Sequence, residues 1–437
     1  MKVKKSFFFN KKILIYGLGK SGISAFNFLK KNNKLFVFDD DRLKKKNKFL
    51  KSKYITLKSL NKKKFDCIIL SPGIDIKKCK LSKILCKNRD KIFTDLDIFC
   101  SSYENLSIAI TGTNGKSTTA QILYEIFLNQ KKDVRIVGNI GNPILSEKKI
   151  YKDTFFIIEV SSYQLSYSKL FKSKYSVILN ISADHLERHG NLNNYINAKF
   201  SLIENQQKNS IAFINNQDLN IKKKINSKKY NIEIIKVDTN KNIKFIKRLN
   251  NEYFNSKGNK ENLCFVLAIC KRLNLKKEKV IKTLKKFKGL DYRQQITFEN
   301  KNLRIINDSK STSFASTESL LKNLKNVYWI LGGIPKKGDS FSLKKKECKN
   351  FKAFIFGKNS TFFFKKLNLK INCKINKDIR SSLNDILKDI SKRIIKKKYT
   401  ILFSPSAASF DDFKNFEERG RYFDKLTKSL IHGKNRI

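Results

Sequence analysis

The stretch Ile108–Ala120 reads IAITGTNGKSTTA and connects an apolar run to a segment with helical periodicity. A glycine-rich loop in this context is typical of phosphate binding, because its backbone amides and the helix N-terminus attract anions. The common phosphate loop, G-x-x-x-x-G-K-[ST], begins with a glycine. The corresponding residue here is Ile110, and the first glycine is Gly112. The sequence therefore predicts a phosphate loop with shortened glycine spacing.

Each residue of this loop has an expected role in binding ATP. In phosphate loops the lysine, here Lys116, contacts the β- and γ-phosphates, and the following hydroxyl, here Ser117, binds Mg2+. The alternative is an ordinary strand-to-helix turn with an incidental lysine. The predicted ATP-binding residues of the loop are Gly112, Thr113, Asn114, Gly115, Lys116, Ser117 and Thr118.

Length and composition bound the class of protein. The chain has 437 residues, 40% of them hydrophobic, which at roughly 150 residues per domain suggests about three domains. No apolar run reaches the roughly 18 residues of a membrane-spanning helix. The N-terminal segment is basic and then apolar, but Asn10-Lys11-Lys12 interrupts it and no small-residue cleavage site follows. We expect a cytoplasmic protein.

The net charge of +57, from 94 Lys and Arg against 37 Asp and Glu, raises the alternative of a nucleic-acid-binding protein. The lysines are spread along the chain, whereas a binding surface requires clustering. The eight cysteines form no C-x-x-C pair, so neither a zinc site nor a disulfide framework is expected. We expect a monomer that binds neither nucleic acid nor membrane.

Apolar runs that alternate with helical patterns predict an α/β fold with parallel sheets. We predict three domains: a Rossmann-like domain at 1–102, a central P-loop ATPase-type domain at 103–290, and a second Rossmann-like domain at 291–437. The predicted strands are Lys12–Tyr16, Lys34–Phe38, Phe65–Leu70, Leu106–Ile110, Thr154–Val160, Val177–Ile181, Ile211–Ile214, Leu303–Asn307, Val327–Leu331, Ala353–Phe356 and Thr400–Phe403.

The first block contains a glycine pattern of its own. Gly17, Gly19 and Gly22 match G-x-G-x-x-G between a predicted strand and helix, and Asp39 ends the next strand. This arrangement is typical of dinucleotide binding and suggests an NAD-dependent dehydrogenase. Judged on this block alone, NAD binding, binding of another nucleotide and a purely structural turn all remain open.

Two further segments of the middle block end apolar strands with polar residues. Glu159 follows FII, and a carboxylate at the end of a buried strand is costly unless it meets a cation or metal. It is either a Mg2+ ligand or a surface carboxylate. Asp184 and His185 follow the next predicted strand. Because His is an unusual ligand for a hard metal, the residue alone favours a structural role.

Four motifs together resemble the Mur ligase family, whose members use ATP to join an amino acid to a UDP-linked peptidoglycan precursor. They are GTNGKST at the phosphate loop, EVSSYQL from Glu159, NISADHLERHG around His185, and NAKF around Lys199. The resemblance implies that Lys199 is carbamylated and that Lys116, His185 and Lys199 are catalytic. It also implies that Ser117, Glu159, His185 and Lys199 serve Mg2+, since a carbamate is an oxygen ligand that this metal accepts.

The third block resembles the members of that family that add D-glutamate. Asn307–Thr312 reads NDSKST, close to their N-D-S-K-A-T, while the D-N-P-R motif of the diaminopimelate-adding members is absent. The motifs LGGIPK at 331–336 and SPSAASFDDFKNFEERG at 404–420 point the same way. The resemblance spans all three blocks and implies UDP-N-acetylmuramoyl-L-alanine and D-glutamate as substrates.

The same resemblance assigns residues to each substrate. For D-glutamate they are Lys310, Thr312, Lys336, Ser409 and the backbone at Phe416. The further ATP contacts are Asn262 at adenine, Arg293 at phosphate or ribose, and Asp308 at ribose. The UDP-linked substrate would contact Gly17, Gly19, Ser21, Asp39, Gly73 and Asn139.

One departure and several alternatives remain. The family's Asp-Thr-Arg appears here as Asp39-Asp40-Asp41-Arg42, so the arginine is displaced and its contact with uracil stays open. Other Mur ligases and folylpolyglutamate synthetase are the near alternatives, although the latter lacks a glycine-rich UDP domain at its N-terminus. A dehydrogenase would leave Lys116, Glu159 and Lys310 unexplained, and a nucleic-acid-binding protein would bind oligonucleotides in a salt-sensitive manner.

Overall fold

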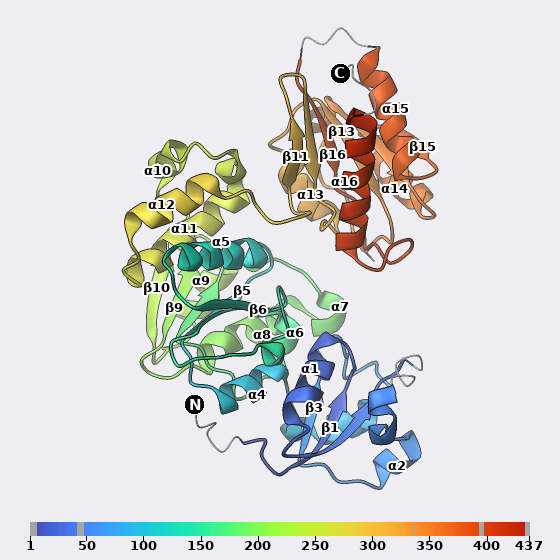
Figure 1. Cartoon of the computed structure of the whole chain (residues 1–437). Helices are drawn as coiled ribbons and strands as arrows, with labels where there is room; N and C mark the ends of the chain where they lie inside the picture. Colours follow the sequence, from blue (N-terminus) through green and yellow to red (C-terminus); the bar gives the residue numbers. More distant parts are fainter. Residues whose placement is uncertain (1–6, 42–47, 337, 393–396, 433–437) are drawn as a thin grey trace. The chain divides into compact units, whose positions relative to one another are not determined.

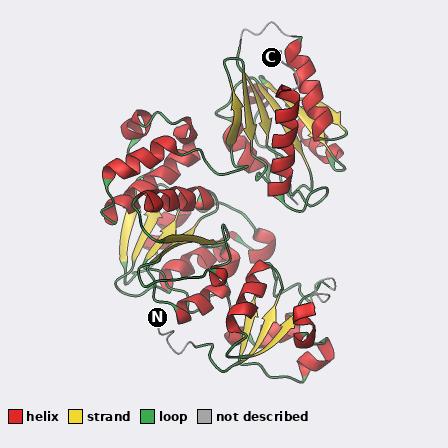
Figure 2. Cartoon of the chain, viewed as in Figure 1, coloured by secondary structure: helices red, strands yellow, loops and turns green. Residues whose placement is uncertain are grey.

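The computed structural model describes residues 7–41, 48–336, 338–392 and 397–432. These residues form a mixed α/β structure with three sheets (Figure 1; Figure 2). Two compact units divide the chain, Met1–Phe287 (unit 1) and Lys288–Ile437 (unit 2). The predicted fold class is therefore confirmed. The boundary predicted after residue 102 lies inside unit 1, between its two sheets, and stays a prediction.

The first sheet of unit 1 is parallel, with the strand order β2-β1-β3-β4. Its strands are β1 (Lys12–Tyr16), β2 (Lys34–Phe38), β3 (Cys67–Leu70) and β4 (Ile92–Phe93). Its helices are α1 (Lys20–Leu29), α2 (Leu57–Asn61), α3 (Ser82–Lys87) and α4 (Asp95–Ser102). Two hydrophobic cores flank the strands, one containing residues of α1 and α4 and the other residues of α3.

The second sheet is also parallel, with the order β10-β9-β8-β5-β7-β6. Its strands are β5 (Ser107–Thr111), β6 (Val134–Gly138), β7 (Phe155–Glu159), β8 (Tyr175–Ile178), β9 (Ile211–Asn215) and β10 (Glu233–Val237). Its helices are α5 (Lys116–Asn129), α6 (Ser162–Leu165), α7 (Leu186–His189), α8 (Leu192–Glu204), α9 (Leu219–Asn226), α10 (Ile243–Arg248), α11 (Lys257–Arg272) and α12 (Lys277–Lys286). In Figure 1, α5, α11 and α12 cover one face of this sheet and α8 the other.

Alternation along the central strand β5 connects the two sheets of unit 1. Successive side chains of a strand point to opposite faces. Ile108 and Ile110 accordingly join the core under α5, while Ala109 joins a core that it shares with the first sheet. In that shared core Phe99 of α4 meets Phe156 of β7 edge to face, with ring centroids 4.8 Å apart. The common core explains why both sheets belong to one compact unit.

Unit 2 contains the third sheet, in the order β11-β12-β16-β13-β14-β15, parallel except for the edge strand β11. Its strands are β11 (Gln295–Glu299), β12 (Leu303–Asn307), β13 (Val327–Gly332), β14 (Phe351–Phe356), β15 (Asn372–Asn376) and β16 (Tyr399–Phe403). Its helices are α13 (Phe314–Leu321), α14 (Ser360–Leu367), α15 (Ile379–Ser391) and α16 (Phe416–His432). Residues of α13 and α14 fill the core on one face, and residues of α15 and α16 the core on the other.

The strand predictions are best where the strand is a continuous apolar run. The predicted bounds of β1, β2 and β12 match the structure, but Val177–Ile181 is displaced, because the strand is Tyr175–Ile178 and the chain then turns into a loop. The strands that the sequence pattern missed include the edge strands β10 and β15, where polar and charged residues hide the apolar signal. Within the described residues, no helix combines the length and hydropathy needed to cross a membrane.

Candidate active site

The loop between β5 and α5 adopts a conformation that requires its glycines. Gly112 and Gly115 have φ values of 157° and 85°, in the left-handed region that favours glycine. A Cβ atom on Gly115 would lie 2.1 Å from Oδ1 of Asn262, a buried side chain of α11. Gly115 is the N-cap of α5, so the helix begins at Lys116, the residue that follows the second glycine of the loop. Ile110, the residue in place of the usual first glycine, is a fully buried residue of β5.

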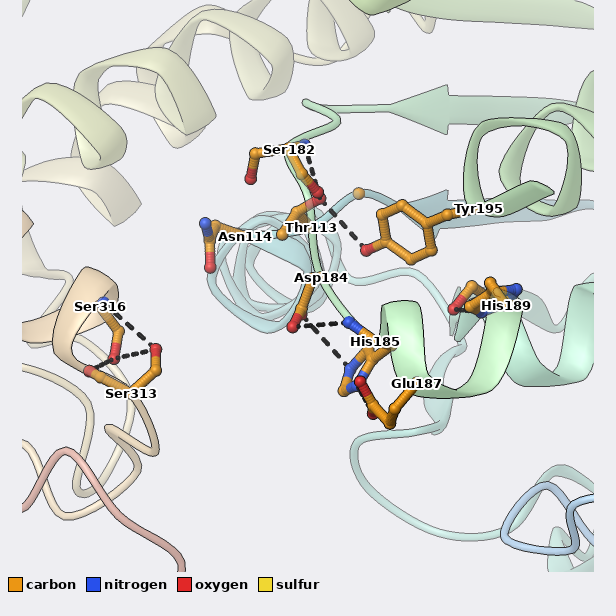
Figure 3. Close-up of polar contacts among 12 residues, drawn as sticks. Thr113, Asn114, Ser182, Asp184, His185, Glu187, His189, Tyr195, Ser313 and Ser316 are labelled. Carbon is orange, nitrogen blue, oxygen red and sulfur yellow. Dashed lines mark hydrogen bonds and ion pairs between the residues drawn. The ribbon is translucent and has the colours of Figure 1, made fainter. Parts of the chain in front are cut away.

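A second loop, after β8, holds the phosphate loop in place. The backbone N–H of Thr113 donates to the carbonyl of Asn180 at 2.9 Å, and the N–H of Asn114 donates to Asn180 Oδ1 at 2.8 Å. The N–H of Ser182 donates to Oγ1 of Thr113 at 3.0 Å, and the hydroxyl of Tyr195 lies 3.2 Å from the same atom (Figure 3). The loop is thus fixed by the carboxyl end of the neighbouring strand.

Two lysine side chains converge on one carbonyl of the loop. Nζ of Lys116 donates to the carbonyl oxygens of Gly112 at 2.8 Å and Thr113 at 2.9 Å. Nζ of Lys199, from α8, donates to the same Gly112 oxygen at 2.9 Å and lies 4.5 Å from the ring centre of Tyr195. Lys199 is only 1% exposed. Burial, and then the positive charge of Lys116, lower the pKa of Lys199 well below its usual value.

The carboxylate of Glu159 lies at the end of β7 and is also only 1% exposed. Its Oε2 accepts a hydrogen bond from the hydroxyl of Ser117 at 2.5 Å, and its Oε1 accepts one from the side-chain amide of Asn139 at 2.7 Å. Both partners are neutral. The structure therefore brings together three of the predicted residues, one hydroxyl, one carboxylate and one amide.

His185 is the N-cap of the short helix α7 and has a left-handed conformation with φ 54°. Its Nε2 lies 3.4 Å from Oδ2 of Asp184, and its Nδ1 lies 3.6 Å from Oε1 of Glu187 (Figure 3). His189, at the other end of α7, is buried and contacts the hydroxyl of Ser162 at 3.0 Å. Burial lowers the pKa of His189 to about 4, so its imidazole is neutral at pH 7.

The glycine turn of the first sheet is tightly packed. A Cβ atom on Gly22 would lie 1.8 Å from the carbonyl oxygen of Gly17, so α1 needs a glycine there to pack on the turn. The hydroxyl of Ser71 donates to the same Gly17 oxygen at 2.7 Å. Asp39 is buried, and its carboxylate accepts the backbone N–H groups of Leu18 at 2.5 Å and Asp41 at 2.9 Å.

The other residues predicted for the UDP-linked substrate lie around this turn. Gly19 is the N-cap of α1. Burial raises the pKa of Asp95, and Gln164 and then Ser21 oppose this shift. Gly73 is exposed, and a Cβ atom there would meet nothing within 4 Å. Arg42, whose displacement raised the question of a uracil contact, lies outside the described residues.

In unit 2 the predicted residues gather at the carboxyl ends of β12, β13 and β16. Nζ of Lys310 lies 3.9 Å from the ring centre of Phe416. Ile334 and Ala408 exchange two backbone hydrogen bonds of 2.9 Å, which brings the segment of Lys336 beside that of Ser409. Thr312 is exposed, Lys336 is half-buried, and Ser409 is 3% exposed.

A buried arginine that the sequence analysis did not single out joins these segments. Nη2 of Arg419 donates to the carbonyls of Ser309 at 2.7 Å and Ala407 at 2.9 Å, and Nε donates to the Ser309 hydroxyl at 3.1 Å. Its motif, FEERG, offered a signal only through the resemblance. Asn180 and Tyr195 were missed as well, because their contacts depend on folding.

Two residues predicted to contact ATP also lie in unit 2. Asp308 is buried, and its carboxylate accepts the Ser404 hydroxyl at 2.8 Å and the N–H of Gln294 at 3.1 Å. Burial raises the pKa of Asp308 to about 7, although Arg293 and Arg419 oppose the shift. Arg293 is half-buried, and its N–H donates to the carbonyl of Leu290 at 3.1 Å.

Comparison with known proteins decides the family. Residues 110–277 match the model of the Mur ligase middle domain, and residues 11–92 match the model of the Mur ligase MurD-like N-terminal domain. The UDP-N-acetylmuramoylalanine--D-glutamate ligase of Rickettsia prowazekii is 33% identical over 95% of this chain and 98% of its own. The chain belongs to the Mur ligase family. The ligase of the same name from Buchnera aphidicola is 37% identical over 97% of this chain and 99% of its own.

Solved structures of Mur ligases share this fold. MurF ligase from Thermotoga maritima, in complex with ADP, gives a TM-score of 0.56 at 15% identity, over 96% of this chain and 99% of its own. UDP-N-acetylmuramate-alanine ligase MurC from the same organism gives 0.54 at 16% identity, over 96% and 100%. Membership of the Mur ligase family argues against the hypothesis of an NAD-dependent dehydrogenase, which rested on the glycine turn alone.

The donor set of this Mur ligase fits a hard divalent cation. A carboxylate as buried as that of Glu159 is costly when its hydrogen-bond partners are neutral, and a bound cation would offset that cost. Ser117 and Glu159 supply oxygen atoms, the ligands that Mg2+ prefers. Among the described residues, no group of three or more His, Cys, Asp or Glu side chains is arranged to hold a metal. A complete set of ligands therefore requires other oxygen donors.

Proposed function

We propose that this chain is an ATP-dependent ligase that adds D-glutamate to UDP-N-acetylmuramoyl-L-alanine during synthesis of the peptidoglycan precursor. The observation that carries the proposal is the cluster of Lys116, Lys199, Ser117 and Glu159 around the shortened phosphate loop. Its support comes from relatives that bear this ligase name and align along nearly the whole chain. We further propose that the protein acts in the cytoplasm as a monomer, without nucleic acid or membrane.

The proposed reaction has two steps. In the first step the alanyl carboxylate of the UDP-linked substrate attacks the γ-phosphorus of ATP, which gives an acyl phosphate and ADP. In the second step the amine of D-glutamate attacks the acyl carbon, the tetrahedral intermediate expels phosphate, and the amine loses a proton. Lys116 offsets the negative charge that develops on the phosphates. Thr113, Asn114 and the N-terminus of α5 orient these phosphates.

We propose Ser117, Glu159, His185 and a carbamylated Lys199 as the residues that hold Mg2+, which would neutralise phosphate charge when bound. Carbamylation needs a neutral amine, which attacks carbon dioxide, forms an N–C bond and releases a proton. The lowered pKa of Lys199 supports this step. The modification would also give the site a further oxygen donor in place of a buried ammonium group beside the half-buried Lys116.

The remaining predicted residues divide among the substrates. Residues 1–102 would bind the UDP-linked substrate through Gly17, Gly19, Ser21, Asp39 and Gly73, with Asn139 from the central domain. Residues 103–290 would bind ATP, with Asn262 at adenine. Residues 291–437 would bind D-glutamate through Lys310, Thr312, Lys336, Ser409 and the Phe416 backbone, and would contact ATP through Arg293 and Asp308. Two carboxylates on D-glutamate match these cationic and hydroxyl donors.

Release of phosphate tests the proposed specificity. The full chain is incubated with ATP, Mg2+ and UDP-N-acetylmuramoyl-L-alanine, together with D-glutamate, L-glutamate, L-lysine or diaminopimelate. We expect release of phosphate above background with D-glutamate alone. Release with L-lysine or diaminopimelate but not with D-glutamate would show a Mur ligase of different specificity.

A further inference from the structure

The guanidinium of Arg188 holds a loop of the first sheet from a helix of the second. Arg188 lies in α7, and its side chain is 11% exposed. Nη1 donates to the carbonyl of Gly73 at 3.4 Å, and Nη2 donates to the carbonyls of Pro72 at 3.3 Å and Ile74. Nε lies 4.0 Å from Oδ2 of Asp75. One side chain thus contacts four consecutive residues of the loop that follows β3.

Tyr163 fixes the guanidinium from the other side. Cζ of Arg188 lies 4.6 Å from the centre of the Tyr163 ring, close enough for a cation–π interaction. The same ring lies 5.0 Å from the imidazole of His185 and is stacked on that of His189 at 5.7 Å. Arg188 and His185 therefore contact the same aromatic ring, and His185 is the N-cap of the helix that carries Arg188.

The loop Pro72–Asp75, which Arg188 contacts, is exposed to solvent at Gly73. The hydroxyl of Ser71 ties the base of the loop to Gly17, and the N–H of Ile74 donates to the Ser71 carbonyl at 3.0 Å. Gly73 is exposed, and the space where its Cβ atom would lie is empty to 4 Å. A loop that is open at its tip depends on contacts such as those of Arg188 for a fixed shape.

We infer that Arg188 is a positioning residue that shapes the loop Pro72–Asp75 for the UDP-linked substrate and links this loop to the His185 segment. This inference rests on the proposed function, in which Gly73 contacts that substrate. A planar guanidinium can serve several carbonyl acceptors at once, and a lysine ammonium lacks this fixed fork of donors. The geometry therefore requires arginine and not only a positive charge.

Calorimetric titration without ATP tests the inference. Binding of UDP-N-acetylmuramoyl-L-alanine is compared between the wild type, Arg188→Ala and Arg188→Lys. We expect both variants to bind at least about tenfold more weakly, because charge-assisted hydrogen bonds and a cation–π contact are lost. Added guanidinium ion should restore part of the affinity of Arg188→Ala. Arg135→Ala is the control, since Arg135 forms ion pairs with Asp133 and Glu147 in the same unit. This control should bind like the wild type.

Hydrogen exchange separates this inference from the proposed function. In the unliganded Arg188→Ala protein, the amide of Ile74, which donates to the Ser71 carbonyl, should exchange about tenfold faster, while the amides of β1 keep their rates. Failure of the wild type to bind the UDP-linked substrate would contradict the proposed function, and the exchange rates would still decide the role of Arg188. Unchanged exchange in this loop, or a loss of affinity matched by a loss of thermal stability in all of unit 1, would overturn the inference.

Discussion

The predicted sites of unit 1 and unit 2 both lie at the carboxyl ends of parallel strands, but they are built differently. In unit 1 the reactive groups themselves are buried, since Lys199 and Glu159 are each 1% exposed and bonded to the phosphate loop or its neighbours. In unit 2 Thr312 is exposed and Lys336 is half-buried, while the buried Arg419 connects the segments behind them. Under the proposed roles, the groups around ATP are fixed before the substrate arrives, whereas D-glutamate would meet the accessible Thr312 and Lys336 as well as the buried Ser409.

The largest expected effect is on the phosphate loop. Lys116→Ala should lower the rate of phosphate release by about a hundredfold to a thousandfold. The variant lacks the positive charge that offsets the negative charge developing on the phosphates in the transition state. The assay is release of phosphate with all three substrates present. Lys132→Ala, at an exposed position of the same unit, is the matched control and should keep full activity. Full activity of Lys116→Ala would refute the assignment of this loop.

The next effect concerns the support of unit 2. Arg419→Met should destabilise unit 2 by about 2–4 kcal/mol, because two backbone carbonyls and one hydroxyl lose a buried charged partner. Chemical denaturation with a probe in unit 2 measures this loss. Arg421→Met, exposed on the same helix, should change the free energy of unfolding by less than about 0.5 kcal/mol. Equal free energies of unfolding for the two variants would show that the contacts of Arg419 do not stabilise unit 2.

A smaller effect should separate recognition from chemistry. Lys310→Ala should raise the KM for D-glutamate by about tenfold to a hundredfold, as expected for the loss of a charge-assisted hydrogen bond of about 1.5–3 kcal/mol. The KM for ATP should stay within about twofold, since Lys310 is proposed to bind the amino acid alone. Initial rates with one substrate varied at a time give both values. A matched rise in both KM values would contradict the division between the two sites.

The last expected effect is a pH dependence of stability in unit 1. The folded pKa of His189 is about 4, below the usual value of about 6.5. Between these values the unfolded chain binds the extra proton, so His189 lowers the free energy of unfolding as the pH falls from 6.5 toward 4. The difference in stability between the wild type and His189→Gln should therefore narrow as the pH falls through this window. A difference that is constant with pH would show that His189 is not held neutral.

The sequence was sufficient for strands such as β1, β2 and β12, because they are apolar runs with clear boundaries. It could not predict polar edge strands such as β10 and β15, which are stabilised by pairing with a neighbour and not by their own apolar pattern. Each pairs with the strand that precedes it along the chain, β10 with β9 and β15 with β14.

The candidate site shows the same limit. The sequence was sufficient to identify the glycine spacing and the motif residues Lys116, Glu159 and Lys199. The structure brings the side chains of these three residues to one loop. The contacts of Arg188 and Arg419 could not be predicted from the sequence, because both side chains bind backbone carbonyls. Any residue type supplies a carbonyl, so no sequence motif marks the partner.

In the proposed mechanism ATP activates the alanyl carboxylate for attack by D-glutamate. Both oxygens of this carboxylate are labelled with 18O, and the phosphate and the peptide product are analysed by mass spectrometry. An acyl phosphate transfers one carboxylate oxygen to phosphate, so we expect one 18O atom per phosphate and one D-glutamyl product per ADP. Unlabelled phosphate, or consumption of ATP without the D-glutamyl product, would refute this mechanism.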